Sequence, residues 1–237
     1  MKIHEAKART LPLRELQRPA SGQVHVWFVQ LQNLPVMEVT APDDLKARLS
    51  QRRMGQKFLL RLLLGAYLGV PGRSIQMATN PSGKPALAGD WANSGLSFNL
   101  SHAGDWLVIA VADSVAVGID IESSQRSLRW RKLSRRYFSA AEADWLDAMD
   151  DVEGALQFLK HWTAREALIK AMGCTIAGNI SSVVLQTTAT PQIELLPEDW
   201  PTADHWQLNL IEHSPNLIAH LACPQRLSEA HYFELDL

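Results

Sequence analysis

Two short segments, far apart in the sequence, most constrain how this chain can fold. In residues 117–122, valine and isoleucine alternate with glycine, aspartate and glutamate, which predicts a strand that carries Asp120 and Glu122 on one face. Further along, Glu166 and Lys170 are spaced by four, which on an α-helix places them on one stripe. If this strand and helix pack together, three carboxylates and one lysine converge, as in a site for Mg²⁺ with positions left for water and phosphate oxygens.

Length, charge and cysteine content narrow the class of protein. The 237 residues, of which 46% are hydrophobic, suffice for one large domain or two small ones with a core that needs no disulfide. With 23 Lys and Arg against 25 Asp and Glu, the net charge of −2 does not favour nucleic acid, so any basic surface must be local. Cys174 and Cys223 have no metal-binding or redox spacing, which indicates reduced thiols.

No segment has the pattern of a signal peptide or of a membrane span. The first residues lack a continuous apolar core, and no apolar run approaches the roughly 20 residues that a bilayer requires. We therefore expect a cytoplasmic protein without membrane contact.

The order of predicted elements is mixed α and β. Residues 1–22 are polar and contain prolines, which predicts an irregular lead-in, whereas residues 42–68 have the pattern of a long helix ended by Gly69 and Pro71. The capping-box sequence from Ser139 to Glu142 predicts a helix over 139–149, and a further helix is expected over 155–172. The remaining predicted elements are strands at 23–31, 183–186, 192–196, 206–211 and 217–222, and an antiparallel meander at 96–101, 106–111 and 115–122.

Two segments concentrate positive charge. The helix over 42–68 has no acidic residue after position 44, and Arg53, Lys57 and Arg61 are spaced by four along one ridge. This ridge is either a solvated helix face or an anion-binding surface, because unpaired cations on one stripe repel each other. A second basic segment lies at 126–136, with no acidic residue between positions 123 and 141.

Four motifs in a fixed order resemble the Sfp-type 4'-phosphopantetheinyl transferase family. They are GKP at 83–85, NLSH at 99–102, GIDIE at 118–122 and WTAREALIK at 162–170. Each motif alone is common, but their order and spacing match the family from about residue 42 to 185. The resemblance implies transfer of 4'-phosphopantetheine from coenzyme A to a serine of a carrier protein, with Mg²⁺, and release of 3',5'-ADP.

The resemblance also implies a fold. We expect an α+β protein of two similar halves related by pseudo-two-fold symmetry, each a small antiparallel sheet packed with a long helix. The halves would comprise residues 1–113 and 114–237, with the coenzyme in the cleft between them. One chain would supply both sides of the cleft, so a monomer is expected.

Functional residues follow from the motif positions. The resemblance assigns Asp120, Glu122 and Glu166 to the metal, Glu166 to the base that takes the serine proton, and Lys170 to stabilising the leaving phosphate. The residues that it assigns to the coenzyme are Arg48, Arg53, Ser82, Gly83, Lys84, Asn99, Ser101 and His102. The acidic carrier protein would dock on Arg126, Arg129, Lys132 and Arg135.

Several positions depart from the family or allow another interpretation. Arg165 replaces the commoner lysine and changes the donor geometry, and Trp162 is expected to pack rather than to bind ligand. Glu166 and Lys170 alone could form an ordinary surface ion pair. The rival functions are a non-catalytic binder of coenzyme A or a nucleotide, and an RNA-binding module; the second lacks a basic strand interleaved with aromatic residues. The carrier served, primary or secondary metabolism, and the role of residues 197–237 are not indicated.

Overall fold

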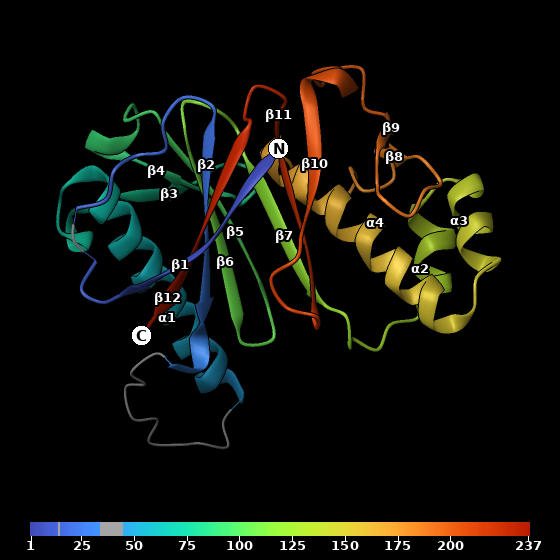
Figure 1. Ribbon diagram of the computed structural model, residues 1–237, viewed down its shortest axis with the longest axis horizontal. Coiled ribbons are helices and arrows are strands. Elements are labelled where there is room, and N and C mark those ends of the chain that lie inside the picture. The colour runs from blue at the N-terminus through green and yellow to red at the C-terminus, as the bar shows by residue number, and fades with distance from the viewer. Residues whose placement is uncertain (14, 34–44) are drawn as a thin grey trace.

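The chain forms two packed sheets, each covered on its outer face by one long helix (Figure 1). The computed structural model describes residues 1–13, 15–33 and 45–237, without the side chains of residues 45, 47 and 48. A five-stranded sheet has the order β1-β12-β2-β6-β5, and a three-stranded sheet has the order β10-β11-β7. The strands of the first sheet are β1 (Lys2–Thr10), β2 (Gln23–Gln30), β5 (Leu96–Ala103), β6 (Trp106–Asp113) and β12 (Glu229–Asp236).

The second sheet, the hairpins and the helices complete the fold. The second sheet contains β7 (Gly118–Ser123), β10 (Trp206–Ile211) and β11 (Leu217–Pro224). Two small hairpins are formed by β3 (Met77–Thr79) with β4 (Pro85–Leu87), and by β8 (Val184–Leu185) with β9 (Ile193–Leu195). The helices are α1 (Leu45–Leu68), α2 (Trp130–Tyr137), α3 (Ala140–Asp147) and α4 (Asp151–Ala171). Short 3₁₀ turns occur at Leu31–Asn33, Gly72–Ser74, Gly89–Trp91 and Ala203–His205.

The two halves of the chain repeat one order of elements. The first half runs β2, α1, hairpin, β5, β6 and has the sheet order β2-β6-β5. The second runs β7, α4, hairpin, β10, β11 and has the order β7-β11-β10, with α2 and α3 inserted before α4. All pairings within these three-strand units are antiparallel. The expected pair of similar α+β halves is therefore present in the topology.

The chain ends differ from the prediction. Residues 1–22 are not all irregular, because β1 pairs in parallel with β12, and β12 pairs in parallel with β2. The first sheet is therefore mixed rather than wholly antiparallel, and β12 lies between strands of the first half. β1 was missed because its side chains are mostly polar and exposed, as an edge strand permits. The division at 113/114 stays a prediction, and β12 crosses it.

The predicted meander is correct only for β5 and β6. These strands form an antiparallel hairpin, but β7 hydrogen-bonds with β11 of the second sheet and not with β6. The α3 prediction is confirmed, including the capping box of Ser139 and Glu142. Helix α4 begins earlier than expected because the Asp150 side chain accepts hydrogen bonds from the first-turn amides of Val152 and Glu153. The basic segment that forms α2 was not predicted as helix.

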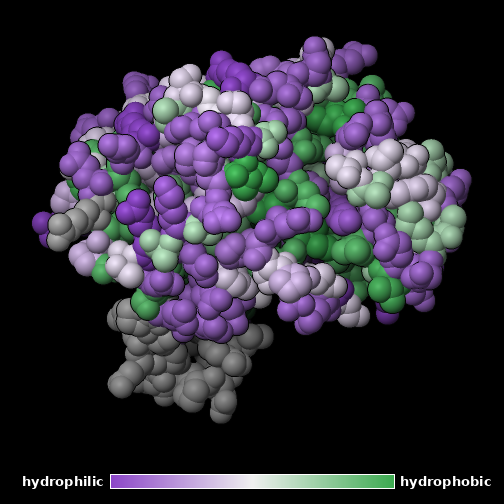
Figure 2. Space-filling model, viewed as in Figure 1, coloured by the Kyte–Doolittle hydropathy of each residue, from purple (hydrophilic) through white to green (hydrophobic). Residues whose placement is uncertain are grey.

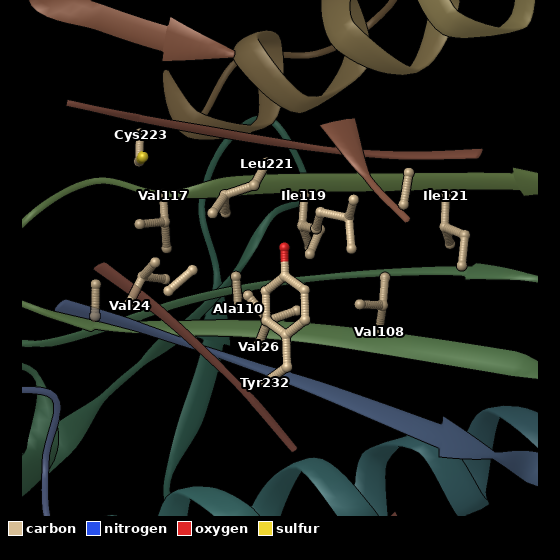
Figure 3. Close-up of a cluster of buried hydrophobic side chains, with 14 of the residues drawn as sticks. Val24, Val26, Val108, Ala110, Val117, Ile119, Ile121, Leu221, Cys223 and Tyr232 are labelled. Carbon is tan, nitrogen blue, oxygen red and sulfur yellow. The ribbon is translucent and has the colours of Figure 1, made fainter. Parts of the chain in front are cut away.

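The space between the sheets is the main shared core. Alternate residues of β2 and β6, such as Val26 and Ala110, face Ile119 and Leu221 of the second sheet (Figure 3). Tyr232 of β12 points into this core, so the last strand also joins the halves. The opposite face of the five-stranded sheet packs on α1 through a second cluster. The layers are therefore α1, five-stranded sheet, three-stranded sheet and α4.

The outer surface fits this arrangement. Figure 2 shows mostly hydrophilic residues, with hydrophobic residues gathered over β10 and α4. The half-buried Leu208 and Leu210 of edge strand β10 belong to clusters that include residues of α4. None of the helices in the described residues combines the length and hydrophobicity that a membrane span requires.

Strand β7 packs directly against the backbone of helix α4. Gly118 lies so close to the helix that a Cβ there would be 1.9 Å from the carbonyl oxygen of Ala167 and 2.4 Å from the amide nitrogen of Ala171. Only glycine allows this approach, because any side chain would have to push the strand away from the helix backbone. Gly118 therefore determines how close the side chains of β7 come to those of α4.

We predict that Gly118→Ala destabilises the fold by about 1–3 kcal/mol or more, because the added methyl group overpacks a backbone contact. Urea unfolding followed by circular dichroism measures this change. Ala116→Ser, at an exposed position two residues earlier, is the matched control and should stay within about 0.5 kcal/mol of wild type. Equal stability of the two variants would contradict the close strand–helix contact.

Candidate active site

A buried cluster joins the two halves where β5, β7 and α4 meet. Lys170 Nζ lies 2.5 Å from Asp120 Oδ1 and donates to Ser101 Oγ at 3.0 Å. The Ser101 hydroxyl donates to the same Asp120 oxygen at 2.7 Å. Asp120 and Ser101 are buried, whereas Lys170 is half-buried. The structure thus brings the Asp120 carboxylate of β7 close to Lys170 of α4, as the spacing predicted, and adds Ser101 of β5, which the resemblance had assigned to the coenzyme.

The other two predicted carboxylates lie at the edge of this cluster. Glu166 Oε2 is 3.8 Å from Lys170 Nζ, one helical turn away. Glu122 forms an ion pair with Arg126, which the sequence placed in the docking segment. Among the described residues, the ligand atoms of Asp120, Glu122 and Glu166 do not all lie within 4.8 Å of one another. The positive charge beside these carboxylates comes from Lys170 and Arg126.

The electrostatics nevertheless fit a site for a hard cation. Asp120 Oδ2 is buried and has no hydrogen-bond partner. Burial raises the pKa of the Glu166 carboxyl, and the neighbouring Asp120 carboxylate raises it further. Burial also raises the pKa of Glu122, although Arg126 opposes the shift. One buried carboxylate with a free oxygen, beside two half-buried carboxylates whose pKa values are raised, is a donor set that a divalent cation stabilises, so these three residues fit one.

Asn99 and His102 lie on opposite faces of β5. The side-chain oxygen of Asn99 accepts a hydrogen bond from the backbone amide of Ile119 at 2.8 Å, so Asn99 joins β5 to β7. His102 is exposed and lines a cavity of about 500 Å³ with Arg52 and Arg126. Partial burial lowers the pKa of His102, and the positive charge of Arg52 lowers it further. Of the two, only His102 presents a side chain that is free to contact a ligand.

The β3–β4 hairpin reaches across to the end of α4. Lys84 Nζ donates to the backbone oxygen of Lys170 at 2.6 Å, and Asn80 Nδ2 donates to the oxygen of Gly173 at 2.9 Å. Burial lowers the pKa of Lys84 to about 8, and Lys170 contributes to that shift. Ser82 and Gly83 form the hairpin turn, where Gly83 has a positive φ of 80° and open space beside it. The resemblance places Asn80 in the loop around the adenine, at residues 79–84, but the sequence did not predict its contact with Gly173 in the other half.

The cationic ridge of α1 lines a separate cavity beside this hairpin. Arg53, Lys57 and Arg61 border a space of about 460 Å³ whose other side is formed by residues of β3, β4 and β5, including Thr79. Within the described residues none of the three forms an ion pair, so their charge is available to an anion. The side chain of Arg48 lies outside the described residues, and its assignment stays a prediction.

The second basic segment is partly neutralised, because three of its six basic residues have acidic partners. Arg126 pairs with Glu122, and Arg131 and Arg135 pair with acidic residues that follow in α3 and α4. Arg129 and Lys132 are exposed and have no acidic partner among the described residues. Of the four residues expected to form a docking surface, only Arg129 and Lys132 therefore keep an unpaired positive charge in the described part of the chain.

A buried ion pair behind the site was also missed. The fully buried Arg165 pairs with Glu142 of α3, donates to the backbone oxygens of His161 and Val183, and lies over the ring of Phe138. Arg165 therefore anchors α4 to α3 and does not face the cluster. Trp162 packs against aromatic neighbours in the same region, as expected. The only sequence signal for Glu142 was its place in the capping box of α3. That signal predicted a helix cap and not an ion pair with Arg165.

Comparison with known proteins shows the family to which the chain belongs. A family model of the 4'-phosphopantetheinyl transferase superfamily matches residues 116–223, and one of the 4'-phosphopantetheinyl transferase N-terminal region matches residues 27–114. The 4'-phosphopantetheinyl transferase HetI of Nostoc sp. is 30% identical over 214 residues, which cover 85% of this chain and 88% of the relative. The chain belongs to the 4'-phosphopantetheinyl transferase superfamily. The resemblance seen in the four motifs is thereby confirmed.

Other relatives match over shorter stretches. The mouse L-aminoadipate-semialdehyde dehydrogenase-phosphopantetheinyl transferase is 31% identical over 54% of this chain and 44% of its own length. The Escherichia coli 4'-phosphopantetheinyl transferase AcpT is 37% identical over 38% of this chain and 45% of its own length. The Thermotoga maritima holo-[acyl-carrier-protein] synthase structure covers 46% of this chain and 62% of its own at 18% identity, with a TM-score of 0.35, too low to inform the fold.

We predict that Glu142→Gln destabilises this transferase by about 3–5 kcal/mol at pH 7, because it leaves the Arg165 charge buried without its partner. Burial alone would raise the pKa of Glu142, but His161 and Arg165 outweigh burial and lower it to about 2 from an ordinary 4.5. The Glu142 carboxylate therefore stabilises the folded state above pH 4.5 and loses this effect as pH falls toward 2. The stability gap between wild type and variant should shrink over that range in urea unfolding series. A gap that stays constant would contradict the assignment.

Proposed function

We propose that the Asp120–Lys170–Ser101 cluster marks the active site in which this chain transfers 4'-phosphopantetheine from coenzyme A to a serine of a carrier protein, releasing 3',5'-ADP. The observation that supports this most is the position of the cluster. It lies at the junction of the two halves, with cavities lined by cations of the first half nearby and carboxylates of the second half within the cluster. Such a division of charge suits a substrate with a diphosphate.

The reaction needs a base and a positive charge at the diphosphate. The carrier serine oxygen forms a bond to the phosphorus that bears pantetheine, and the bond from that phosphorus to the oxygen of 3',5'-ADP breaks. Glu166, one helical turn from Lys170 at the edge of the cluster, takes the serine proton directly or through a water molecule. Lys170 stabilises the charge that develops on the leaving phosphate.

The three carboxylates would hold Mg²⁺. Asp120 contributes its buried, unpartnered Oδ2, and Glu122 and Glu166 complete the set. When bound, the ion neutralises charge on the diphosphate and orients it. Binding would require Glu122 to exchange Arg126 for the ion, and Lys170 would then be free to turn from Asp120 toward the substrate phosphate.

The coenzyme would extend from this cluster over the first half. His102 lines a cavity that also includes Glu122, and Arg53 lines the separate cavity beside the β3–β4 hairpin; both cationic linings suit phosphate oxygens. Lys84, with Ser82 and Gly83 of the hairpin turn, would border the adenine. Ser101 and Asn99 belong to the same motif, but their present hydrogen bonds hold Asp120 and β7, which favours a positioning role. A monomeric enzyme in the cytoplasm remains our expectation.

Incubation with an apo carrier protein, coenzyme A and Mg²⁺ should add one phosphopantetheine mass to the carrier, detected by mass spectrometry. Glu166→Gln and Lys170→Ala should each reduce this rate by at least about 100-fold, a loss in the range expected for a positioned base or an electrostatic contact. Lys160→Ala, on the same helix outside the cluster, is the matched control and should keep wild-type activity. No mass gain on fatty-acid, polyketide or peptide carriers would refute the function, whereas near-normal rates in either active-site variant would refute only the residue roles.

We predict that Arg129→Glu with Lys132→Glu raises the KM for the carrier at least about tenfold and leaves the KM for coenzyme A unchanged, since rim charges steer an acidic partner. Arg135 is unsuitable for this test because it pairs with Asp144 and Asp147. Lys7→Glu with Arg9→Glu, both exposed on β1, makes the same change in net charge and is the matched control. Steady-state kinetics with each substrate varied in turn gives both constants, and unchanged carrier kinetics in the double variant would exclude this docking surface.

A further inference from the structure

A second cluster of metal-ligating side chains lies on the α1 face of the five-stranded sheet, away from the active site. His4 of β1 is directly opposite His231 of β12, which is in turn opposite His25 of β2. Glu229 precedes His231 by two residues, so its side chain lies on the same face. Phe233, the next residue on this face, packs in the cluster against α1. The second half of the molecule, with its carboxylates, packs on the opposite face of the sheet.

The geometry of this cluster is convergent. His4 Nε2 lies 3.8 Å and His231 Nε2 lies 3.4 Å from the same oxygen, Glu229 Oε2. The two imidazole rings are stacked, with centroids 4.2 Å apart and an interplanar angle of 9°. The three ligand atoms all lie within 4.8 Å of one another, and this is the only group of three or more such residues in the described part of the chain that does so. Two strands thus bring three donor atoms close together.

The protein leaves one of these donors unpaired. His4 Nε2 is buried and has no hydrogen-bond partner, because its distance to Glu229 is too long for a hydrogen bond. The Glu229 carboxylate is oriented independently by Gln23, whose side-chain amide donates to it at 3.1 Å. A buried imidazole nitrogen with no partner, facing an oriented carboxylate, is costly unless a ligand binds it.

We propose that His4, Glu229 and His231 form a binding site for a divalent transition-metal ion of the Zn²⁺ class. Two imidazoles and one carboxylate are donors that favour Zn²⁺, Ni²⁺ or Cu²⁺ over Mg²⁺, which prefers oxygen ligands alone. The three side chains are partly exposed, so the ion reaches the site from solvent and water completes its coordination. One ligand comes from β1 and two from β12, so the bound ion fastens the edge strand to the sheet.

The neighbouring charges are compatible with this site. His25 lies behind His231 and contacts the hydroxyl of Tyr67 at 2.7 Å. Burial lowers the pKa of His25 to about 4, with a contribution from His231, so His25 adds no positive charge at neutral pH. Lys2 is opposite Glu229 and is the nearby cation with which the ion competes.

The test is zinc binding by the intact chain after removal of metals with a chelator. Titration with ZnCl₂ against a fluorescent zinc indicator should show one site that persists in Glu166→Gln, where the active-site carboxylates are altered. His4→Ala and His231→Ala should each weaken this site by at least about tenfold. His205→Ala removes an exposed histidine elsewhere and should leave zinc affinity unchanged. Full affinity in His231→Ala, or loss of the site in Glu166→Gln, would overturn the proposal.

A second measurement needs no variant. Hydrogen exchange of the amides in β1 should slow when ZnCl₂ is added to the wild-type chain, because zinc at the proposed site adds a second link between the paired strands β1 and β12. It should not slow with MgCl₂, because the two imidazole ligands do not favour Mg²⁺. Unchanged exchange in β1 at saturating ZnCl₂ would overturn the proposal. Neither readout depends on transferase activity, so this site stands or falls separately from the proposed reaction.

Discussion

The packing of β7 directly on the backbone of α4 is the contact on which the candidate site depends. Gly118 removes the side chain that would separate them, and Asp120, two residues further along the same face, then reaches Lys170. A wider spacing would leave the Asp120 carboxylate buried without its cation, which is costly in a low-dielectric interior. The Arg165–Glu142 pair fixes the same helix from its other side. Packing against β7 on one side and the ion pair with α3 on the other therefore fix the position of helix α4.

The duplicated topology explains why the site lies where it does. Each half has a sheet that is hydrophobic on both faces, so each covers one face with its own helix and the other with the partner sheet. The edges of the two sheets meet at β5 and β7, and the Asn99 hydrogen bond to Ile119 joins them there. Polar groups from both halves can therefore converge at this seam, while the shared core behind it remains apolar. Strand β12 also connects the two halves, because it follows the second sheet in the chain and pairs with β2 of the first sheet.

Much of the fold and part of the site followed from local pattern. The strand at β7, the helices α3 and α4 and the β5–β6 hairpin were predicted because alternation, helical spacing and capping residues are local properties. Strand β1 was missed because its side chains are mostly exposed, and an exposed edge strand needs no hydrophobic period. Helix α2 does have a helical period, since Trp130, Leu133 and Tyr137 pack in the core, but the segment was interpreted by its positive charge alone. The basic segment at 126–136 was overestimated because Asp144 and Asp147, which neutralise Arg135, follow it in the chain and return to it only through the α2–α3 turn.

The sequence by itself determined which side chains share a face. Asp120 with Glu122, and Glu166 with Lys170, follow from periods of two and of about 3.6 residues, which are fixed by backbone geometry. The motif order also identified the family before any contact was known. Only the tertiary structure decided the partners: Lys170 for Asp120, Arg126 for Glu122, Glu142 for Arg165, and the place of β12 between β1 and β2. Local backbone geometry orients a side chain, whereas its partner depends on which distant segments the packing of the whole chain brings together.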